Sequence, residues 1–307
     1  MVENDEINLK EVLLVLWQGR KFISTITGVI SSLSVLIALM LPNIYSANAL
    51  LAPAEKSSGA MSALMQQYGG LASLAGVPLP GGEETSRAQL GMTLMTSRGF
   101  VGEFIERHAI LPELMAVDAW DYRSGDISFD TDLYNAETGE WLRQVALPLK
   151  PKPSALEAYE VFKEILSVSQ DKNTGYVTVS IEHKSPTIAA QWVTWLVEDV
   201  NDAVRAQDVN EARKSIDYLR RQVASTSLAE LQVVFFDLIQ GQMETVMLAE
   251  VRQEYVFKTI DPAVPPEEKS KPSRAIICVL GALFGAVLGA VISLFRHYSK
   301  LSLAKLA

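Results

Sequence analysis

The 307-residue sequence contains one cysteine and three histidines, and both shortages narrow its chemistry. Cys278 has no partner for an intrachain disulfide, and in its apolar surroundings we expect a packing residue rather than a reactive thiol. The histidines, at positions 108, 183 and 297, have no spacing typical of a metal site or a catalytic triad. The segment "GGEETS" lacks the lysine of a Walker A loop. We therefore expect no enzyme, no cofactor and no bound metal.

Positive charge is also scarce, because 27 Lys and Arg residues face 36 Asp and Glu residues, for a formal net charge of −9. Nucleic-acid binding requires a basic face to contact phosphates, and the sequence has none that we can identify. Acidic pairs such as Glu198 and Asp202 share a predicted helix with Arg205 and Arg213, which is typical of a solvated helix face. Nucleic acid is thus excluded as an expected partner.

Two long runs, 22–41 and 275–295, contain no charged residue at all. Each is long enough to cross a hydrocarbon core of about 30 Å as a helix, so we predict two transmembrane helices. A proton relay or an ion path would need ionisable residues inside these runs, which they lack. The chain is therefore expected to be a membrane-anchored protein with one substantial domain between the spans, and not a transporter.

Basic residues near the first span predict the orientation. Lys10, Arg20 and Lys21 precede this span, whereas no basic residue follows it until Lys56, so 1–21 is expected in the cytoplasm. Residues 42–274 are then exported and the tail 296–307 is cytoplasmic. Around the second span the rule is ambiguous, since three basic residues, Lys269, Lys271 and Arg274, precede it on the predicted outer side.

A cleaved signal peptide is the alternative interpretation of the run 22–41, because "YSANALLA" loosely resembles a small-residue cleavage site. The apolar run exceeds the usual ~7 to 15 residues, and the segment before it is acidic as well as basic, which favours a permanent span. In either case the middle of the chain is exported.

The second span carries glycine at every fourth position, at Gly281, Gly285 and Gly289. Glycine weakens a helix by about 1 kcal/mol relative to alanine, so a compensating contact is expected. Lipid provides no hydrophobic drive for helices to associate, and small residues allow the close backbone approach on which association depends. We predict that this stripe is a helix-packing surface.

Three stretches between the spans have the alternation typical of β-strands: 43–53, 255–265, and 166–181, which forms a hairpin around "DKNTG". A proline-rich segment, 262–272, follows the last of these and contains Pro262, Pro265, Pro266 and Pro272. Such prolines favour an extended, stiff spacer before the second span. The stretch 120–153 is turn-rich and has no clear pattern.

Helical patterns occupy the remainder. A short interrupted helix is expected over 57–75, and a second helix follows Ser97, ends near His108 and buries Phe100, Phe104 and Ile105. Ser185 and Pro186 then begin a long helix over 186–223, with a seam at Val209, Ala212, Ile216, Leu219 and Val223.

A second long helix is expected over 228–251 after a break at "STS". Ser227 and Glu230 form a capping-box pattern, and the predicted stripe consists of Leu228, Leu231, Phe235 and Leu238. So short a break allows the two helices either to double back as a hairpin or to continue with a kink.

Several of these segments together resemble the Wzz-type polysaccharide co-polymerases, the bacterial O-antigen chain length determinant proteins. The resemblance rests on "DEINLKEVLLVLWQGRKFI" before the first span, "IYSANALLAP" and "YGGLASLAG" after it, and "FKTIDPAVPPEEKSKPSR" before the glycine-bearing second span. It implies an α+β membrane protein in which two transmembrane helices flank a periplasmic domain with an α/β membrane-proximal base and a long helical protrusion.

The resemblance further implies an inner-membrane protein that assembles as a homo-oligomeric ring. Members of that family set how many repeat units a Wzy-type polymerase adds to a lipid-linked glycan such as O-antigen. The glycine stripe could then contact the first span of the same subunit, a neighbouring subunit or the polymerase. An export adaptor for capsule or exopolysaccharide, acting with a separate tyrosine kinase, is the alternative; a periplasmic sensor and an anchored glycan hydrolase are more distant ones.

Overall fold

The computed structural model describes residues 15, 17–54, 83–225 and 229–306, with side chains left out at 83–86, 229–230 and 297–306. The described chain divides into two compact units. One unit, called here the helix pair, combines the terminal segments up to Ile44 and from Lys269 onward. The other, called here the middle domain, is Tyr45–Glu268. The predicted helix over 57–75 and the predicted capping box at Ser227 lie outside the described residues.

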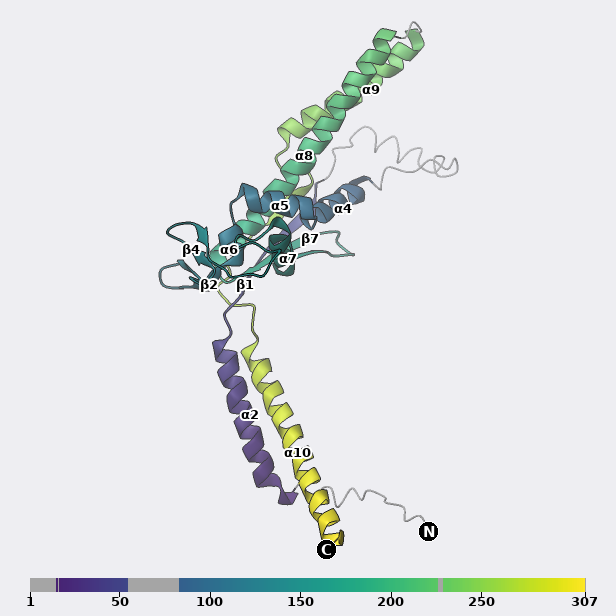
Figure 1. The fold of residues 1–307 in the computed structure, drawn as a ribbon. Coiled ribbons are helices and arrows are strands. Elements are labelled where there is room, and N and C mark those ends of the chain that lie inside the picture. Colours follow the sequence, from purple (N-terminus) through teal and green to yellow (C-terminus); the bar gives the residue numbers. More distant parts are fainter. Residues whose placement is uncertain (1–14, 16, 55–82, 226–228, 307) are drawn as a thin grey trace, which may run out of the picture. The chain divides into compact units, whose positions relative to one another are not determined.

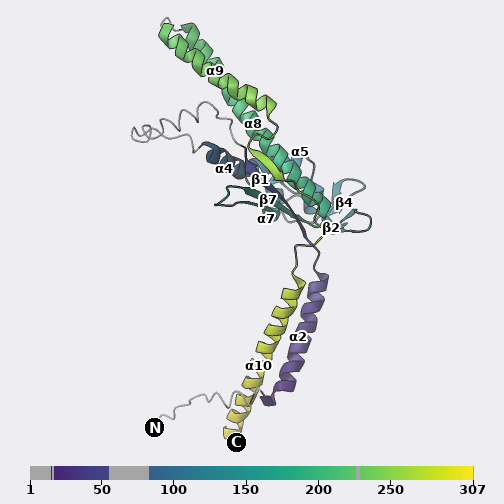
Figure 2. The same cartoon turned by 180° about the vertical axis from the view of Figure 1, so that it is seen from behind.

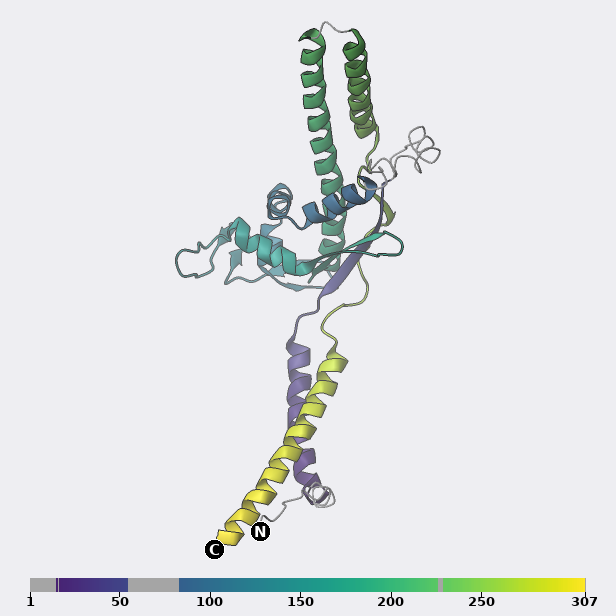
Figure 3. The same ribbon diagram turned by 90° about the vertical axis from the view of Figure 1, so that its right-hand side faces the viewer.

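The helix pair consists of α2 (Arg20–Met40) and α10 (Arg274–Leu306), which run side by side (Figures 1 and 3). Both are long and apolar enough to cross a membrane, with mean hydropathies of 2.1 and 2.7 over their most apolar windows. Their outward faces expose large apolar side chains such as Leu36 and Phe284. That exposure is what lipid-facing helices require and what the core helix of a water-soluble protein lacks.

An antiparallel four-stranded sheet forms the base of the middle domain, in the order β6-β7-β1-β8. The strands are β1 (Tyr45–Pro53), β6 (Leu166–Gln170), β7 (Val177–His183) and β8 (Phe257–Asp261). The predicted hairpin is confirmed as β6–β7. Its turn is stabilised by the Asp171 carboxylate, which accepts hydrogen bonds from the backbone N–H groups of Asn173 and Thr174 at 2.7 and 2.9 Å.

The core lies between this sheet and the first half of α8 (Pro186–Ser225), which packs on β1 and β7 (Figure 2). Trp192, Leu196 and Val200 of α8 are fully buried, as are the alternate β7 residues Val177 and Val179. β7 shows strict alternation of buried and partly exposed positions, which explains why its pattern was readable in the sequence.

Four shorter helices complete the core: α4 (Glu83–Met95), α5 (Arg98–Arg107), α6 (Leu111–Met115) and α7 (Ala155–Ile165). The Ser97 hydroxyl accepts from the Phe100 N–H at 3.4 Å, so the predicted cap of α5 is confirmed, and the predicted inner face is buried. Ser154 and Glu157 form a capping box at the start of α7. The capping residues fix where α5 and α7 begin.

The weakly patterned stretch contains two small two-stranded hairpins. They are β2 (Val117–Trp120) with β3 (Ile127–Phe129), and β4 (Tyr134–Asn135) with β5 (Glu140–Trp141). Strands of two to four residues are too short to produce a readable alternation.

The second half of α8 continues beyond the core and pairs with α9 (Ala229–Val251) as a helical hairpin, which Figure 3 shows from the side. The chain therefore doubles back at the break instead of continuing with a kink. At about 1.5 Å per residue, the 40 residues of α8 extend roughly 60 Å. The fold class predicted from the sequence, an α+β protein with an apolar helix near each end and a long helical hairpin, is confirmed.

Candidate functional site

The helical hairpin is the first candidate surface, and its α8 side follows the predicted seam. Ala212 and Ile216 are buried against α9, with exposed fractions of 1% and 8%. Val209, Leu219 and Val223 are partly buried on the same helical line. The structure therefore brings these five residues onto one face, although any role in assembly stays a prediction.

The predicted stripe on α9 is wrong in part. Leu231 and Leu238 are 44% and 50% exposed, so they do not face α8. Phe235 is partly buried as predicted, and Leu228 lies outside the described residues. The buried or partly buried line takes the position after Leu231 and the position after Leu238, and consists of Gln232, Phe235, Ile239, Gln242, Val246 and Ala249. Apolar residues surround α9 almost completely, so two stripes fitted the pattern equally well, and the true one contains two glutamines.

Exposed apolar side chains of α9 lie on both flanks of this line, with Leu231, Val234 and Leu238 on one flank. The other flank, called here the outer face of α9, exposes Val233, Phe236, Met243 and Met247. The helix carries four acidic residues and neither lysine nor arginine. A helix that exposes apolar side chains beyond its contact line is normally covered on more than one side.

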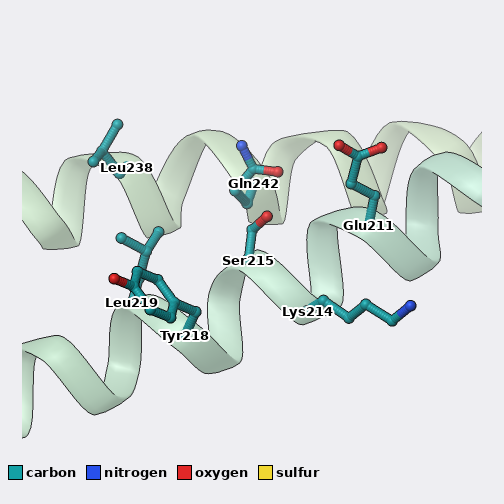
Figure 4. A pocket seen from close by; sticks show the side chains of 7 residues that line it. All are labelled: Glu211, Lys214, Ser215, Tyr218, Leu219, Leu238 and Gln242. Atoms are coloured by element: carbon teal, nitrogen blue, oxygen red, sulfur yellow. The ribbon is translucent and has the colours of Figure 1, made fainter.

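Two hollows flank the seam between α8 and α9. The first, of about 440 Å³, is lined by Tyr218 and Leu219 of α8 and by Leu238 of α9, and Ser215 faces Gln242 across it (Figure 4). The second, of about 330 Å³, lies on the opposite flank and includes Arg220 and Met247. Each flank thus offers a shallow, partly apolar recess bordered by charged residues.

A polar network fixes the hairpin to the sheet. The buried Asn201 side chain accepts from the backbone N–H groups of Val256 and Phe257 at 2.8 and 2.9 Å and donates to the Phe257 carbonyl at 3.1 Å. Two turns further along α8, Asp208 accepts from the Tyr255 hydroxyl at 2.8 Å and pairs with Arg87 of α4 at 3.1 Å. Burial and the neighbouring Asp208 raise the pKa of Tyr255 to about 12. The segment that returns from α9 to β8 is therefore held at three consecutive residues.

The predicted glycine stripe of α10 lies against α2 of the same chain. A Cβ added at Gly285 would be 3.0 Å from the Cα of Thr27, and one added at Gly289 would be 3.2 Å from the Cα of Ile23. Gly281 lies against the side chain of Ser34. Of the three partners left open by the sequence, the structure pairs the stripe with the first span.

The segments beside the helix pair are joined by a short backbone ladder. Ile44 donates to the Lys271 carbonyl at 3.0 Å, and its own carbonyl accepts from Ser270 at 2.8 Å. The Asn43 side chain accepts from Lys269 and Arg274 at 3.4 and 3.1 Å. Lys269, Lys271 and the first residue of α10, Arg274, thus contact the segment that follows α2, a contact that the sequence did not predict.

The four prolines of the proline-rich segment lie between β8 and α10 in chain without regular helix or strand, apart from the bridge at Lys271. Their predicted stiffness is not tested by this arrangement. Within the described ranges, no three His, Cys, Asp or Glu side chains are placed to hold a metal ion.

The described chain combines two long apolar helices with a sheet and a helical hairpin, and one family model matches part of it. The model of the family "Wzz: Chain length determinant protein" matches residues 5–108, about a third of the chain. The resemblance predicted from the sequence is therefore confirmed over that segment. No curated protein matches the chain.

Two solved structures are similar at low identity. A full-length bacterial polysaccharide co-polymerase is 13% identical, with a TM-score of 0.43 over 95% of this chain and 98% of that chain. A fragment of WzzB, the polysaccharide co-polymerase from Salmonella Typhimurium, is 12% identical, with a TM-score of 0.29 over 75% of this chain and 100% of that one.

Proposed function

We propose that this protein is a polysaccharide chain length determinant, a non-enzymatic oligomeric scaffold that sets the modal length of a Wzy-polymerised lipid-linked glycan such as O-antigen. The family match over 5–108 carries the proposal. That segment includes α2, β1 and α5, which place one apolar helix, a central strand and part of the core. The rest of the chain has the second apolar helix and the long hairpin that the same family implies.

The proposed location is the bacterial inner membrane, with both termini in the cytoplasm and the middle domain in the periplasm. The contact of α2 with α10 supports a permanent first span, because a segment removed as a signal peptide would not keep this partner. Basic residues before α2 support the orientation. The basic residues before α10 are in part engaged by Asn43, which gives them a structural reason to lie on the outer side.

The outer face of α9 supports assembly into a ring of identical subunits. A single chain leaves Phe236 and Met247 at 58% and 64% exposure. α9 carries acidic residues and no lysine or arginine, whereas α8 carries Arg220 and Arg221. The charge of α9 in one subunit is therefore complementary to these basic residues on α8 of a neighbouring subunit. A contact between different faces of identical subunits closes into a ring when its rotation allows.

The deciding experiment compares surface polysaccharide in the source bacterium, resolved by gel electrophoresis, with this gene deleted and then restored. The proposal expects deletion to replace a preferred length with a broad ladder and restoration to recover that length. A ladder of unchanged profile with loss of total surface polysaccharide would instead establish the export adaptor that acts with a separate tyrosine kinase.

A further inference from the structure

We propose that a groove along α5, bounded by the β4–β5 hairpin and the start of α7, binds an extended oligosaccharide segment. This inference rests on the proposed function, since it names where the regulated glycan touches the protein. The groove lies entirely within the middle domain and is separate from the helical hairpin.

The groove consists of two adjoining hollows of about 460 and 550 Å³, and both volumes fall in the range of ligand-binding pockets. Both hollows are lined by Gly102, Glu106 and Ala155, so they share a wall and follow one another along α5. An elongated recess of this kind accommodates consecutive units of a polymer better than a single compact ligand.

Glycines keep the face of α5 low. Gly99 and Gly102 lie three residues apart, on one side of the helix, and a Cβ added at either would meet nothing within 4 Å. Packing within the described part of the chain therefore gives no reason for glycine there, although each costs about 1 kcal/mol of helix stability relative to alanine. The missing side chains leave room for an external molecule to approach the helix surface closely.

Aromatic rings line one end of the groove. Tyr134 and Trp141, opposite one another on the β4–β5 hairpin, have ring centroids 5.0 Å apart, and both border the 460 Å³ hollow. Both are only partly buried, so part of each ring is accessible. Sugar rings present apolar C–H faces that pack on aromatic rings while their hydroxyls remain hydrated or hydrogen-bonded.

Polar groups of both signs border the same space. Glu106 of α5 and Lys152 line the 460 Å³ hollow, and Arg98 and Glu103 line the other. Carboxylates accept from sugar hydroxyls and cations donate to them, so the mixed set suits a hydroxyl-rich chain better than a strongly charged polymer.

The wall that carries Lys152 is held in place by Arg143. Its guanidinium donates to the carbonyls of Lys150 and Pro151 at 3.0 and 2.8 Å and pairs with Glu157 at 2.7 Å. The pKa of Glu157 is lowered by its hydrogen bond from the Ser154 backbone and by Arg143. The groove is therefore preformed, which limits the ordering cost of binding.

The test uses the full-length protein in detergent micelles. The probe is the host's own surface polysaccharide, released from lipid by mild acid, fractionated by size and labelled at its reducing end. Fluorescence anisotropy is expected to show binding that weakens about tenfold in Trp141→Ala and in Gly102→Leu. Tyr122→Ala is the matched control, because Tyr122 is 71% exposed in the same region and does not line the groove.

Each result has a definite meaning. If Trp141→Ala fails to fold, Gly102→Leu provides the test instead, since a side chain added at Gly102 meets open space. Unchanged binding in Gly102→Leu, or equal loss in Tyr122→Ala, would overturn the proposed groove. Stronger binding of peptide-free cell-wall glycan strands than of the surface polysaccharide would also overturn the proposal, because the ligand would then be cell-wall glycan.

A second readout separates this proposal from the proposed function. Both groove variants are expressed in the deletion strain and their polysaccharide ladders compared. A wild-type ladder with both variants, in a strain whose deletion abolishes the preferred length, would refute the groove and leave the chain length role intact.

Discussion

At the residue level, His183 shows how a buried polar group is satisfied in only one protonation state. The imidazole is 8% exposed, its Nδ1 accepts from the Ser185 N–H at 3.0 Å, and its Nε2 lies 3.1 Å from the Glu113 carbonyl. These partners assign a neutral ring with the proton on Nε2. Burial, chiefly, lowers the pKa of His183 below 6.5, because a charged ring would lose its hydration.

Acid is therefore expected to destabilise the middle domain. The unfolded chain binds a proton on this histidine near pH 6.5 whereas the folded chain does not, so stability is full above that pH and falls below it. Between pH 6.5 and 5.5 the free energy of unfolding should fall, by at most about 1 kcal/mol. Denaturant titration of the full-length protein in detergent at a series of pH values measures this loss.

Comparison with one variant isolates the contribution of His183. His183→Gln should flatten the slope in this window. Burial raises the pKa of Glu113, which gives a slope of opposite sign above pH 4.5, so the difference between wild type and His183→Gln is the informative quantity. An identical slope in both proteins would contradict the assignment.

The start of α5 at Ser97 and its end near His108 were predictable from the sequence, but the turn that follows the helix was not. Ser97 was identified because serine before an apolar periodic segment has a single local role. Ala109 adopts φ = +52° in a six-to-one turn in which Ile110 donates to the Ile105 carbonyl at 3.2 Å, a position where glycine is usual. Because alanine and not glycine occupies position 109, the sequence did not indicate this turn. The burial of Ile110 accounts for the strained conformation of Ala109.

At the level of elements, the α2–α10 contact depends on which glycines have neighbours. Gly285 and Gly289 lie within 3.0 to 3.2 Å, measured from an added Cβ, of the α2 backbone, whereas Gly28 of α2 has nothing within 4 Å. Thus the same residue type has two roles in one helix pair: close packing at 285 and 289, and an outward position at 28. Spacing alone identified the stripe correctly as one surface, but it did not identify its partner.

Gly285→Leu is expected to separate the helix pair. An added side chain would overlap the Thr27 backbone, which cannot give way as a flexible side chain could, at a cost of about 1–3 kcal/mol. Cysteines introduced at Gly19 and Ser293, where an added Cβ lies 3.3 Å from the Ser293 Cβ, report the contact by disulfide formation in a Cys278→Ser background.

Gly28→Leu is the matched control, since it makes the same substitution in the same helix pair at an open position. Cross-linking should be slow in Gly285→Leu and as fast as wild type in Gly28→Leu. Equal rates in both variants would refute the packing role of the stripe.

The α9 seam illustrates a limit of pattern analysis for single helices. The α8 seam was predictable because charged residues flank it and leave one apolar line. On α9, Val233, Val234 and Phe236 lie outside the contact and Gln232 lies inside it, so hydrophobicity gave the wrong phase. The return of the chain after α9 is fixed by hydrogen bonds to Asn201, a tertiary contact that the α9 pattern does not contain.

At the level of the whole molecule, the arrangement of strands was beyond the sequence pattern. Each strand of the four-stranded sheet was predicted from its own alternation, yet β1 pairs with β7 on one side and β8 on the other, joining positions more than a hundred residues apart. Local patterns give no information about such pairing. The helices α5, α8 and α9 followed from periodicity, whereas α4, α6, α7 and the short strands β2 to β5 were not predicted.

Assembly is expected to depend on the outer face of α9. Phe236→Asp places a charge on an exposed aromatic position, so the single chain should fold normally while the association constant falls by at least about tenfold. Light scattering of the detergent-solubilised protein after size-exclusion chromatography measures the change as a smaller particle mass, and thermal unfolding checks the fold.

Leu147→Asp provides the comparison, because Leu147 is 92% exposed in a loop outside the hairpin. It should leave the particle mass unchanged. The same mass for all three proteins would exclude this face as a subunit contact.

The backbone ladder between Ile44 and Lys271 has a consequence for how such proteins diversify. Because the chain leaves and re-enters the helix pair at two hydrogen-bonded neighbours, the middle domain is topologically an insert in the turn of an antiparallel helical hairpin. Inserts with adjacent ends can be lengthened, shortened or exchanged without changing how the flanking elements meet. The membrane anchor and the domain are thus free to evolve as separate modules.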